Sequence, residues 1–195
     1  MKAVIIKYNA GNIRSVSFAL ERLGIAPVIT GDLEEIMSAD RVIFPGVGEA
    51  STTMSYLKEH KLDQVIARLK QPVLGVCLGM QLLCRHSEEN DTTCLGVFPQ
   101  QVRRFAPRQK EKVPHMGWNK LEETSDWCED FQDKYVYFVH SFYVPVCEYT
   151  TAASNYVQPF SAMMRKDNFF AAQFHPEKSG EDGALILTKF LNTIW

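Results

Sequence analysis

Short apolar runs alternate with amphipathic stretches along the first half of the chain. The runs are too short for helices and end at turn residues, so they predict buried strands, and the stretches between them have helical spacing. Strands are expected at residues 3–7, 27–30, 41–44 and 72–74, and helices at residues 12–23, from Asp32 onward, and at 51–70. Asn12 is expected to cap the first helix and Gly24 to end it.

The second half of the chain is richer in predicted strands. Closely spaced apolar runs at residues 101–105, 135–139, 151–154, 162–165 and 169–174 indicate antiparallel hairpins. A last helix is expected over residues 182–195, with Leu185, Ile186, Phe190 and Leu191 on its buried face. Together the two halves predict an α/β fold of the flavodoxin or Rossmann kind: a mostly parallel central sheet, helices on both faces and appended antiparallel strands. No repeat or flexible linker divides residues 1–195, so they are expected to form a single domain.

Cys77 lies at the sharpest predicted turn. It stands in the segment Gly-Val-Cys-Leu-Gly, directly after the strand at 72–74 and before a helical stretch from Met80 to Cys84. A nucleophile with a glycine two positions away on each side, between a strand and a helix, is typical of a nucleophile elbow. Such a turn favours the thiolate at a helix N-terminus and aims the N–H of Leu78 at a developing oxyanion. The alternative is a small buried hydrophobic cysteine.

His175 and Glu177 form a second reactive cluster near the C-terminus. His175 follows the apolar strand 169–174, and Glu177 stands two positions later. Residues two apart in an extended chain point to the same side, so the carboxylate is expected to hold the imidazole and the imidazole to serve the thiol. The predicted catalytic triad is therefore Cys77, His175 and Glu177. The alternative is a core cysteine and a strand-end histidine beside a surface glutamate.

A loop with two glycines, from Pro45 to Gly48, follows the strand at 41–44. Sites in parallel sheets gather beyond the carboxyl ends of the strands, where this loop, Cys77 and His175 are all expected. The glycines would let the N–H of Val47 turn toward the carbonyl that the thiol attacks, as an oxyanion donor beside Leu78. Taken by itself, the loop is equally an ordinary turn between a strand and a helix.

The composition is that of an ordinary globular protein and argues against several function classes. A net charge of -2 gives no electrostatic reason to expect a nucleic-acid or membrane partner. No apolar stretch approaches the length of a membrane span, and the N-terminus has the pattern of a strand rather than of a signal peptide. The 5 cysteines are an odd number without C-x-x-C pairs, so neither a disulfide framework nor a zinc site follows, and a cytoplasmic location is expected.

The segment Gly-Val-Cys-Leu-Gly-Met-Gln around Cys77, together with His-Pro-Glu at 175–177, resembles the triad-type (class I) glutamine amidotransferases. The resemblance spans essentially the whole chain and implies their α/β fold. It implies that Cys77 attacks the side-chain amide of glutamine and that His175 carries the proton to departing ammonia. Water would then release glutamate from the thioester while Glu177 orients His175. This chemistry needs no metal or organic cofactor.

Several further segments are similar to the family of amidotransferase subunits of imidazole glycerol phosphate synthase, which act in histidine biosynthesis. They are residues 8–15, 45–48, 114–119, 139–142 and 173–180, and Pro-His-Met-Gly-Trp-Asn at 114–119 discriminates best. The resemblance implies a heterodimer with a cyclase (synthase) subunit, a (β/α)8 barrel that takes up the ammonia. Ammonia is mostly protonated near neutral pH, so a sealed passage between subunits would keep it neutral and exclude water.

The resemblance also implies a glutamine site. Glu89 would suit the substrate α-ammonium, and backbone N–H groups around Ser141 and Phe142 would suit its α-carboxylate. Phe142 stands where the family often has tyrosine, so a hydroxyl contact is lost there and a backbone role remains. Without the resemblance, Glu89 is one of several solvated acids in the run 88–91. The implied glutamine-site residues are Gly48, Gln81, Glu89, Ser141 and Phe142.

A partner surface is implied in the same way, by Asn12, Trp118, Tyr137 and Lys178. Trp118 stands in a predicted Gly-Trp-Asn loop, where the alternative is a core aromatic; at an interface, tryptophan offers a large contact area. The chain reads Lys-Tyr-Asn at 7–9 where the family usually has Asp-Tyr-Gly. The basic residues Arg103, Arg104, Arg108, Lys110 and Lys112 match no motif and are expected in a solvated loop.

Three other functions stay open at this level. Another amidotransferase subunit, for anthranilate or pyridoxal phosphate synthesis, would share the triad but is not expected to have the segment at 114–119. A thiol-based stress protein or an intracellular cysteine peptidase would share the elbow, although Gln81 and Glu89 after the thiol favour a small amino-acid substrate. A non-catalytic binding subunit would not need an intact Cys77, His175 and Glu177.

Overall fold

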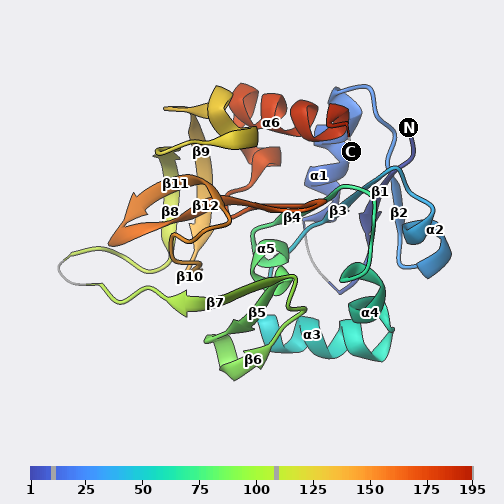
Figure 1. Cartoon of the computed structure of the whole chain (residues 1–195), viewed down its shortest axis with the longest axis horizontal. Helices are drawn as coiled ribbons and strands as arrows, with labels where there is room; N and C mark the ends of the chain where they lie inside the picture. Colours follow the sequence, from blue (N-terminus) through green and yellow to red (C-terminus); the bar gives the residue numbers. More distant parts are fainter. Residues whose placement is uncertain (10–11, 108–109, 195) are drawn as a thin grey trace.

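The computed structural model describes residues 1–9, 12–107 and 110–194, and its centre is a seven-stranded sheet (Figure 1). The strand order is β11-β12-β13-β4-β3-β1-β2. The parallel strands are β1 (Ala3–Ile6), β2 (Val28–Thr30), β3 (Arg41–Phe44), β4 (Val73–Val76) and β13 (Phe169–Ala172). At one edge, β12 (Gln158–Lys166) and β11 (Thr150–Tyr156) continue the sheet in antiparallel fashion. The predicted fold class is confirmed.

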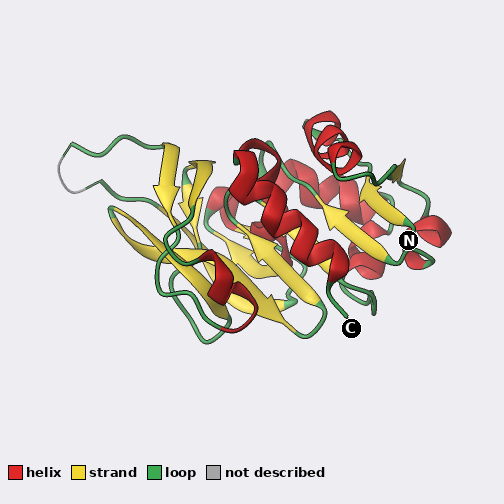
Figure 2. Cartoon of the chain, turned by 90° about the horizontal axis from the view of Figure 1, so that it is seen from above, coloured by secondary structure: helices red, strands yellow, loops and turns green. Residues whose placement is uncertain are grey.

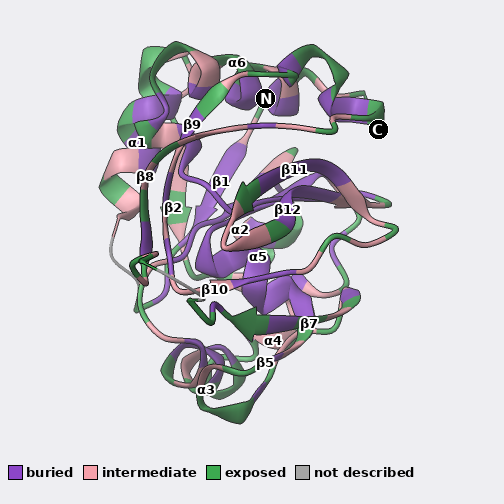
Figure 3. Ribbon diagram, turned by 90° about the vertical axis from the view of Figure 1, so that its left-hand side faces the viewer, coloured by how far each residue is buried: buried purple, intermediate pink, exposed green. Residues whose placement is uncertain are grey.

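Helices cover both faces of this sheet (Figures 1 and 2). One face is covered by α1 (Ile13–Arg22) and α6 (Gly180–Asn192), and the other by α2 (Leu33–Met37), α3 (Ala50–Glu59), α4 (Leu62–Ile66) and α5 (Leu78–Leu83). Successive strand residues point to opposite faces, so Ile5 packs in one hydrophobic core while Val4 and Ile6 pack in the other. Burial on both faces explains why these strands are continuous apolar runs, and Figure 3 shows them enclosed between the helices.

The first half follows its predicted elements closely. Gly24 has φ 79 and ends α1, and the Asp32 side chain accepts from the Glu35 N–H at 2.9 Å and caps α2. The helical pattern predicted over 51–70 forms two helices, because Lys61 adopts φ 57 and separates α3 from α4. Within the described ranges, no helix is long and apolar enough to cross a bilayer.

The second half departs further from the prediction. The segment containing Trp118, expected as a loop, is β8 (His115–Lys120), and it pairs antiparallel with β9 (Tyr135–His140). Cys84, expected to end a helix, instead begins a strand of a small second sheet. That sheet has the order β10 (Phe142–Tyr143), β7 (Phe98–Arg104), β5 (Cys84–Ser87) and β6 (Thr92–Thr93). The 3-10 turns are η1 (Glu89–Asp91), η2 (Asp126–Phe131) and η3 (Pro176–Lys178).

The buried face of the last helix, α6, differs from the predicted one at Leu185. Ile186 and Phe190 are buried, whereas Leu185 is 52% exposed, so its predicted core position is wrong. The buried stripe repeats at intervals of three and four residues, and position 185 lies to one side of it. The helix also begins earlier than predicted, at Gly180.

Candidate active site

The backbone at Cys77 is strained and tightly packed. Cys77 follows β4 with φ 53 and ψ -108, a conformation that non-glycine residues rarely adopt. A Cβ atom on Gly79 would lie 2.0 Å from the carbonyl oxygen of Phe44, and one on Gly46 would lie 2.4 Å from the nitrogen of Gly79. Because β3 and α5 approach this closely, the elbow requires glycine on both sides of the contact. The Cys77 N–H also donates to the carbonyl of Ala172 at 2.7 Å, which ties the turn to β13.

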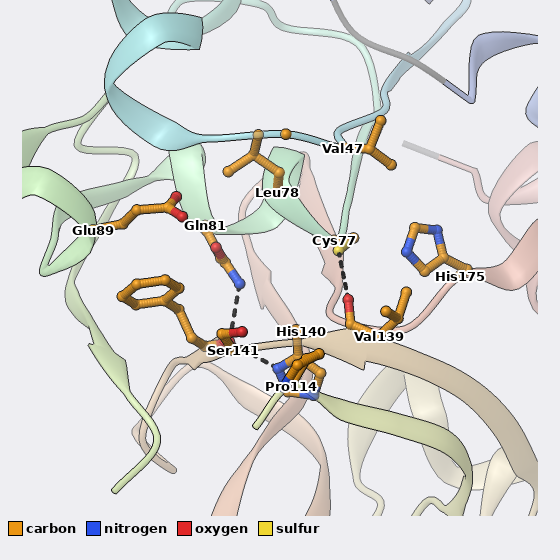
Figure 4. Close-up of a pocket in the computed structure, with 12 residues that line it drawn as sticks. Val47, Cys77, Leu78, Gln81, Glu89, Pro114, Val139, His140, Ser141 and His175 are labelled. Carbon is orange, nitrogen blue, oxygen red and sulfur yellow. Dashed lines mark hydrogen bonds between the residues drawn. The ribbon is translucent and has the colours of Figure 1, made fainter. Parts of the chain in front are cut away.

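The sulfur of Cys77 lies at the floor of a cavity, and the residue is 7% exposed. The thiol donates to the carbonyl oxygen of Val139 over 3.9 Å, and Nε2 of Gln173 donates to the sulfur over 3.8 Å. Figure 4 shows the imidazole of His175 facing the same sulfur from the side opposite Leu78 and Gln81. The sulfur therefore faces an acceptor, a donor and a base.

His175 and Glu177 form a buried pair. Nδ1 of His175 lies 2.8 Å from Oε1 of Glu177, and both side chains are 1% exposed. The predicted contact is present, but the reason given for it was wrong: β13 ends at Ala172, and Glu177 lies in the turn η3. The turn begins with Pro176, whose fixed φ suits a first helical position, and it folds the carboxylate back toward the imidazole.

The surroundings of His175 favour the protonated form of its imidazole. Burial lowers its pKa, but the charge of Cys77 and the hydrogen-bonded carboxylate of Glu177 outweigh burial and hold the pKa above its ordinary value. Nε2 is buried and has no partner within hydrogen-bond geometry among the described residues. Such a base can accept the thiol proton and pass it to a leaving group.

Asn12 holds the carboxylate of Glu177. It occupies the predicted cap position of α1 with φ 72, but its side chain makes no capping hydrogen bond. The left-handed turn directs the side chain away from the helix, and Nδ2 donates to Oε1 of Glu177 instead. Oε1 thus accepts from both His175 and Asn12, which fixes the rotamer of the carboxylate.

One cavity of about 380 Å³ joins the sulfur to the residues predicted for oxyanion and substrate contacts (Figure 4). Its volume falls in the range of small-molecule sites. Three lining residues, Pro114, Val139 and His140, were not predicted, although they lie in the segments 114–119 and 139–142 that had been singled out. The predicted residues that line it are Val47, Gly48, Cys77, Leu78, Gln81, Glu89, Ser141, Phe142 and His175.

Glu89 is not an ordinary solvated acid. It is half-buried at the cavity wall, and its Oε2 accepts from the N–H of Ala50 at 2.8 Å, at the start of α3. Burial raises the pKa of its carboxyl, the hydrogen bond from Ala50 lowers it, and the charge of Glu49 raises it; the net pKa is raised. A partly desolvated carboxylate of this kind is stabilised by a ligand cation.

The wall opposite the elbow is built on two buried histidines. Nδ1 of His140 donates to the carbonyl of Phe142 at 2.7 Å, and Nε2 of His140 lies 3.1 Å from Nδ1 of His115. Burial lowers the pKa of His115 to about 4 and, chiefly by the same cause, that of His140 to about 3. Both rings are therefore neutral near pH 7, and His115 is the donor to His140. Neither histidine was predicted as a site residue.

The residues implied for a partner surface lie around the outside of the triad. Trp118 and Tyr137 are cross-strand neighbours with ring centroids 6.0 Å apart, and Trp118 is 56% exposed, which excludes a core position. The carbonyl of Tyr137 accepts from the His175 N–H at 2.9 Å, and the exposed Lys178 is the neighbour of Glu177. Arg103, Arg104, Lys110 and Lys112 are exposed as expected, but Arg103 and Arg104 lie in β7 and not in the predicted loop, and Arg108 lies outside the described residues.

Comparisons with known proteins agree on one family over nearly the whole chain. The family model for glutamine amidotransferase class-I matches residues 5–194. Imidazole glycerol phosphate synthase subunit HisH of Bacteroides thetaiotaomicron is 59% identical over 195 residues, covering 98% of the chain and 100% of the relative. The protein of that name from Bacteroides fragilis is 61% identical over 194 residues, covering 98% and 99%. A solved glutamine amidotransferase matches with TM-score 0.73 and 20% identity, covering 96% of the chain and 97% of that structure, and supports the fold.

Proposed function

Because the chain belongs to the class-I glutamine amidotransferase family, we propose that it hydrolyses L-glutamine to glutamate and ammonia as the glutaminase subunit of an imidazole glycerol phosphate synthase. The ammonia passes to a cyclase subunit, a (β/α)8 barrel, which makes imidazole glycerol phosphate and aminoimidazole carboxamide ribotide in histidine biosynthesis. Residues 1–195 act as a single domain of a cytoplasmic heterodimer. Full-length similarity to subunits of that name supports this proposal. The observation that carries it is the single cavity shared by Cys77, His175 and Glu89.

Catalysis begins with transfer of the Cys77 proton to Nε2 of His175. The thiolate attacks the carboxamide carbon of glutamine, and the imidazolium returns the proton to ammonia as the C–N bond breaks. A water molecule, deprotonated by His175, then releases glutamate from the thioester. Glu177 stabilises the imidazolium through its 2.8 Å contact with Nδ1. The N–H groups of Val47 and Leu78, both at the cavity, are the donors for the oxyanion.

Substrate recognition combines one charge with directed hydrogen bonds. Glu89 binds the α-ammonium, because the partly buried carboxylate needs a cation. Nε2 of Gln81 donates to the carbonyl of Phe142 and to Oε1 of Gln173, both at 3.0 Å, so Gln81 can offer a ligand only its oxygen. Backbone N–H groups at Ser141 and Phe142 bind the α-carboxylate, and Gly48 lines the same cavity.

The partner docks on the outside of the triad, over Asn12, Trp118, Tyr137 and Lys178. Met116 and Trp118 are both exposed on β8, and contiguous exposed apolar side chains of this size mark interaction sites. Asn12 touches Glu177 directly, and Tyr137 touches the backbone of His175. A barrel subunit seated here would therefore act on the two residues that move the proton. We expect weak glutamine hydrolysis by the chain alone and strong hydrolysis when the partner carries its own ligand.

Replacing the nucleophile tests this function. Cys77→Ala should abolish glutamine-dependent synthesis by the reconstituted complex, by more than about 10³-fold, and leave synthesis from added ammonium intact. The matched control is Cys84→Ala, since Cys84 is a buried thiol whose pKa burial raises well above its ordinary value. That variant should retain glutamine turnover.

Three results would contradict the proposal. Glutamine-dependent synthesis by Cys77→Ala at the parental rate would exclude the thiol. Activation of the chain only by an anthranilate or pyridoxal phosphate synthase partner would place it in another amidotransferase complex. Peptide cleavage without glutamine turnover would assign the thiol to a peptidase.

A further inference from the structure

Gln173 is a fully buried polar side chain beside the sulfur, and the steps proposed above give it no role in the chemistry. Its exposed fraction is 0%, and its backbone N–H donates to the carbonyl of Ala162 at 2.9 Å, which fixes it just beyond the end of β13. Nε2 lies 3.8 Å from the sulfur of Cys77, and Oε1 lies 3.0 Å from Nε2 of Gln81. A buried amide costs free energy unless its groups are hydrogen-bonded, so both ends of this side chain depend on these contacts.

The orientation of the Gln173 amide follows from its neighbours. The carbonyl of Phe142 can only accept, so the Gln81 atom that lies 3.0 Å from it is the NH2 nitrogen. That same nitrogen lies 3.0 Å from Gln173, whose facing atom must therefore be its oxygen. The NH2 group of Gln173 is thereby directed at the sulfur of Cys77. This assignment rests on donor and acceptor identity and not on a free choice of amide rotamer.

The surroundings of the sulfur differ for its two protonation states. As a thiol, the S–H donates to the carbonyl of Val139 over 3.9 Å. After the proton has moved to Nε2 of His175, the sulfur can only accept, and the carbonyl of Val139 repels its negative charge. The N–H of Gln173 is then a second side-chain donor toward the sulfur beside the imidazolium of His175, and hydrogen bonds to charged atoms are stronger than neutral ones.

We propose, building on the glutaminase function, that Gln173 is a further residue of the reaction centre, whose Nε2–H stabilises the Cys77 thiolate while its Oε1 holds Gln81 toward the substrate. Gln173 gives up no proton in this role. The amide of Gln173 then both stabilises the Cys77 thiolate and fixes the position of the Gln81 side chain. Loss of its donor lowers the thiolate population, and loss of its oxygen frees Gln81 to turn.

Other titratable groups around the sulfur stay the same in a Gln173 variant. They are His175 with its partner Glu177, Glu89 in the same cavity, the buried neutral His140, and Tyr8, whose hydroxyl donates to the carbonyl of Pro45. Burial, and after it the charge of Cys77, raises the pKa of Tyr8 far above neutral pH, so its proton stays in place. A change in the reactivity of Cys77 therefore reports on Gln173.

The test measures the rate of Cys77 alkylation by iodoacetamide against pH, on the isolated chain, with peptide mass spectrometry to separate Cys77 from the other thiols. Gln173→Glu keeps an oxygen for Gln81 but puts a second oxygen against the sulfur. Its alkylation midpoint should rise by at least about one pH unit, which is about tenfold slower alkylation below the midpoint. Gln173→Met removes the donor without adding charge and should slow alkylation roughly three- to tenfold.

Asn168→Asp is the matched control, because Asn168 is also a buried amide, with Nδ2 donating to the carbonyls of Leu69 and Gln71 at 2.8 Å. It should lower thermal stability and leave the alkylation profile of Cys77 unchanged. If Gln173→Glu does not fold, Gln173→Met decides. A parental profile in Gln173→Met, or an equal shift in Asn168→Asp, would overturn the inference. The assay uses neither glutamine nor partner. If the reconstituted parent complex made no product from glutamine while the Gln173 variants still shifted the alkylation profile, only the proposed function would be refuted.

Discussion

The two walls of the cavity are held in place by different kinds of interaction. The elbow wall, with Cys77, rests on backbone packed against backbone, where Gly46 and Gly79 leave no room for a methyl group. The opposite wall rests on hydrogen bonds made by two histidine side chains, from His115 to His140 and from His140 to the backbone carbonyl of Phe142. The first wall is sensitive to added volume and indifferent to pH. The second is sensitive to protons.

This difference suits the division of labour in the proposed reaction. The nucleophile needs an unchanging position, because displacement of a reacting atom by about 1 Å costs a large part of the rate. The wall formed by residues 139–142 lines the cavity, where it would contact the α-carboxylate of glutamine in the proposed reaction. A hydrogen-bonded wall can hold two arrangements of donors and acceptors, which a close-packed backbone cannot.

Gly79→Ala breaks the elbow wall and should have the largest effect. The new Cβ would lie 2.0 Å from the carbonyl oxygen of Phe44, so β3 and α5 must separate. We expect a loss of about 3 kcal/mol or more in the free energy of unfolding, measured by urea denaturation. Gly96→Ala is the matched control, because Gly96 has φ +75 but no atom within 4 Å of its added Cβ. It should cost about 1 kcal/mol from backbone strain alone, and equal losses would contradict the close-packing argument.

The elbow wall is also the part of the site that the sequence predicted best. Its features are local: an apolar run, a nucleophile between two glycines, and a helix within a dozen residues. The histidine wall depends on the pairing of β8 with β9, across about twenty residues, and alternation in β8 is hidden because Met116 and Trp118 are apolar yet exposed. His115 and His140 could not be recognised as a pair without that pairing. Glu177 shows the reverse case: its contact with His175 was predicted from a strand geometry that the turn η3 replaces.

Acid should weaken the histidine wall and leave the elbow unaffected. The pKa values of His115 and His140, about 4 and about 3, lie below the unfolded value, so their neutral burial stabilises the fold above about pH 6.5. As pH falls from 6.5 toward 4, His115 and His140 become protonated in the unfolded chain but stay neutral in the folded protein. Each histidine then removes about 1.4 kcal/mol of stability per pH unit.

His115→Phe should remove one of the two histidines that bind a proton in the unfolded state but not in the folded state. Phenylalanine keeps the stacking on Tyr156, where the ring centroids are 4.0 Å apart. The slope of unfolding free energy between pH 6 and pH 4.5 should fall by about 1.4 kcal/mol per unit, measured by urea denaturation at each pH. His60→Phe, at an exposed position at the end of α3, should leave the slope as it is. An unchanged slope in His115→Phe would mean that the histidine wall opens before the protein unfolds.

Glu89 combines features of the two walls, and its replacement should have the smallest effect on stability. Its carboxylate is bound by a backbone N–H, as at the elbow, yet it titrates, as the histidine wall does. Because its folded pKa is raised, its contribution to stability is full below the unfolded pKa and is lost as pH rises through the folded one. Glu89→Gln should therefore match the parent near pH 4 and gain only a few tenths of a kcal/mol at pH 7, since water still screens the half-buried group. The KM of Glu89→Gln for glutamine should nevertheless rise at least about tenfold, the loss expected for one charged contact. The control is Glu88→Gln, at the exposed neighbouring position, which should leave KM unchanged. A parental KM in Glu89→Gln would exclude Glu89 from the substrate site and leave it only as the acceptor of the Ala50 N–H at the start of α3.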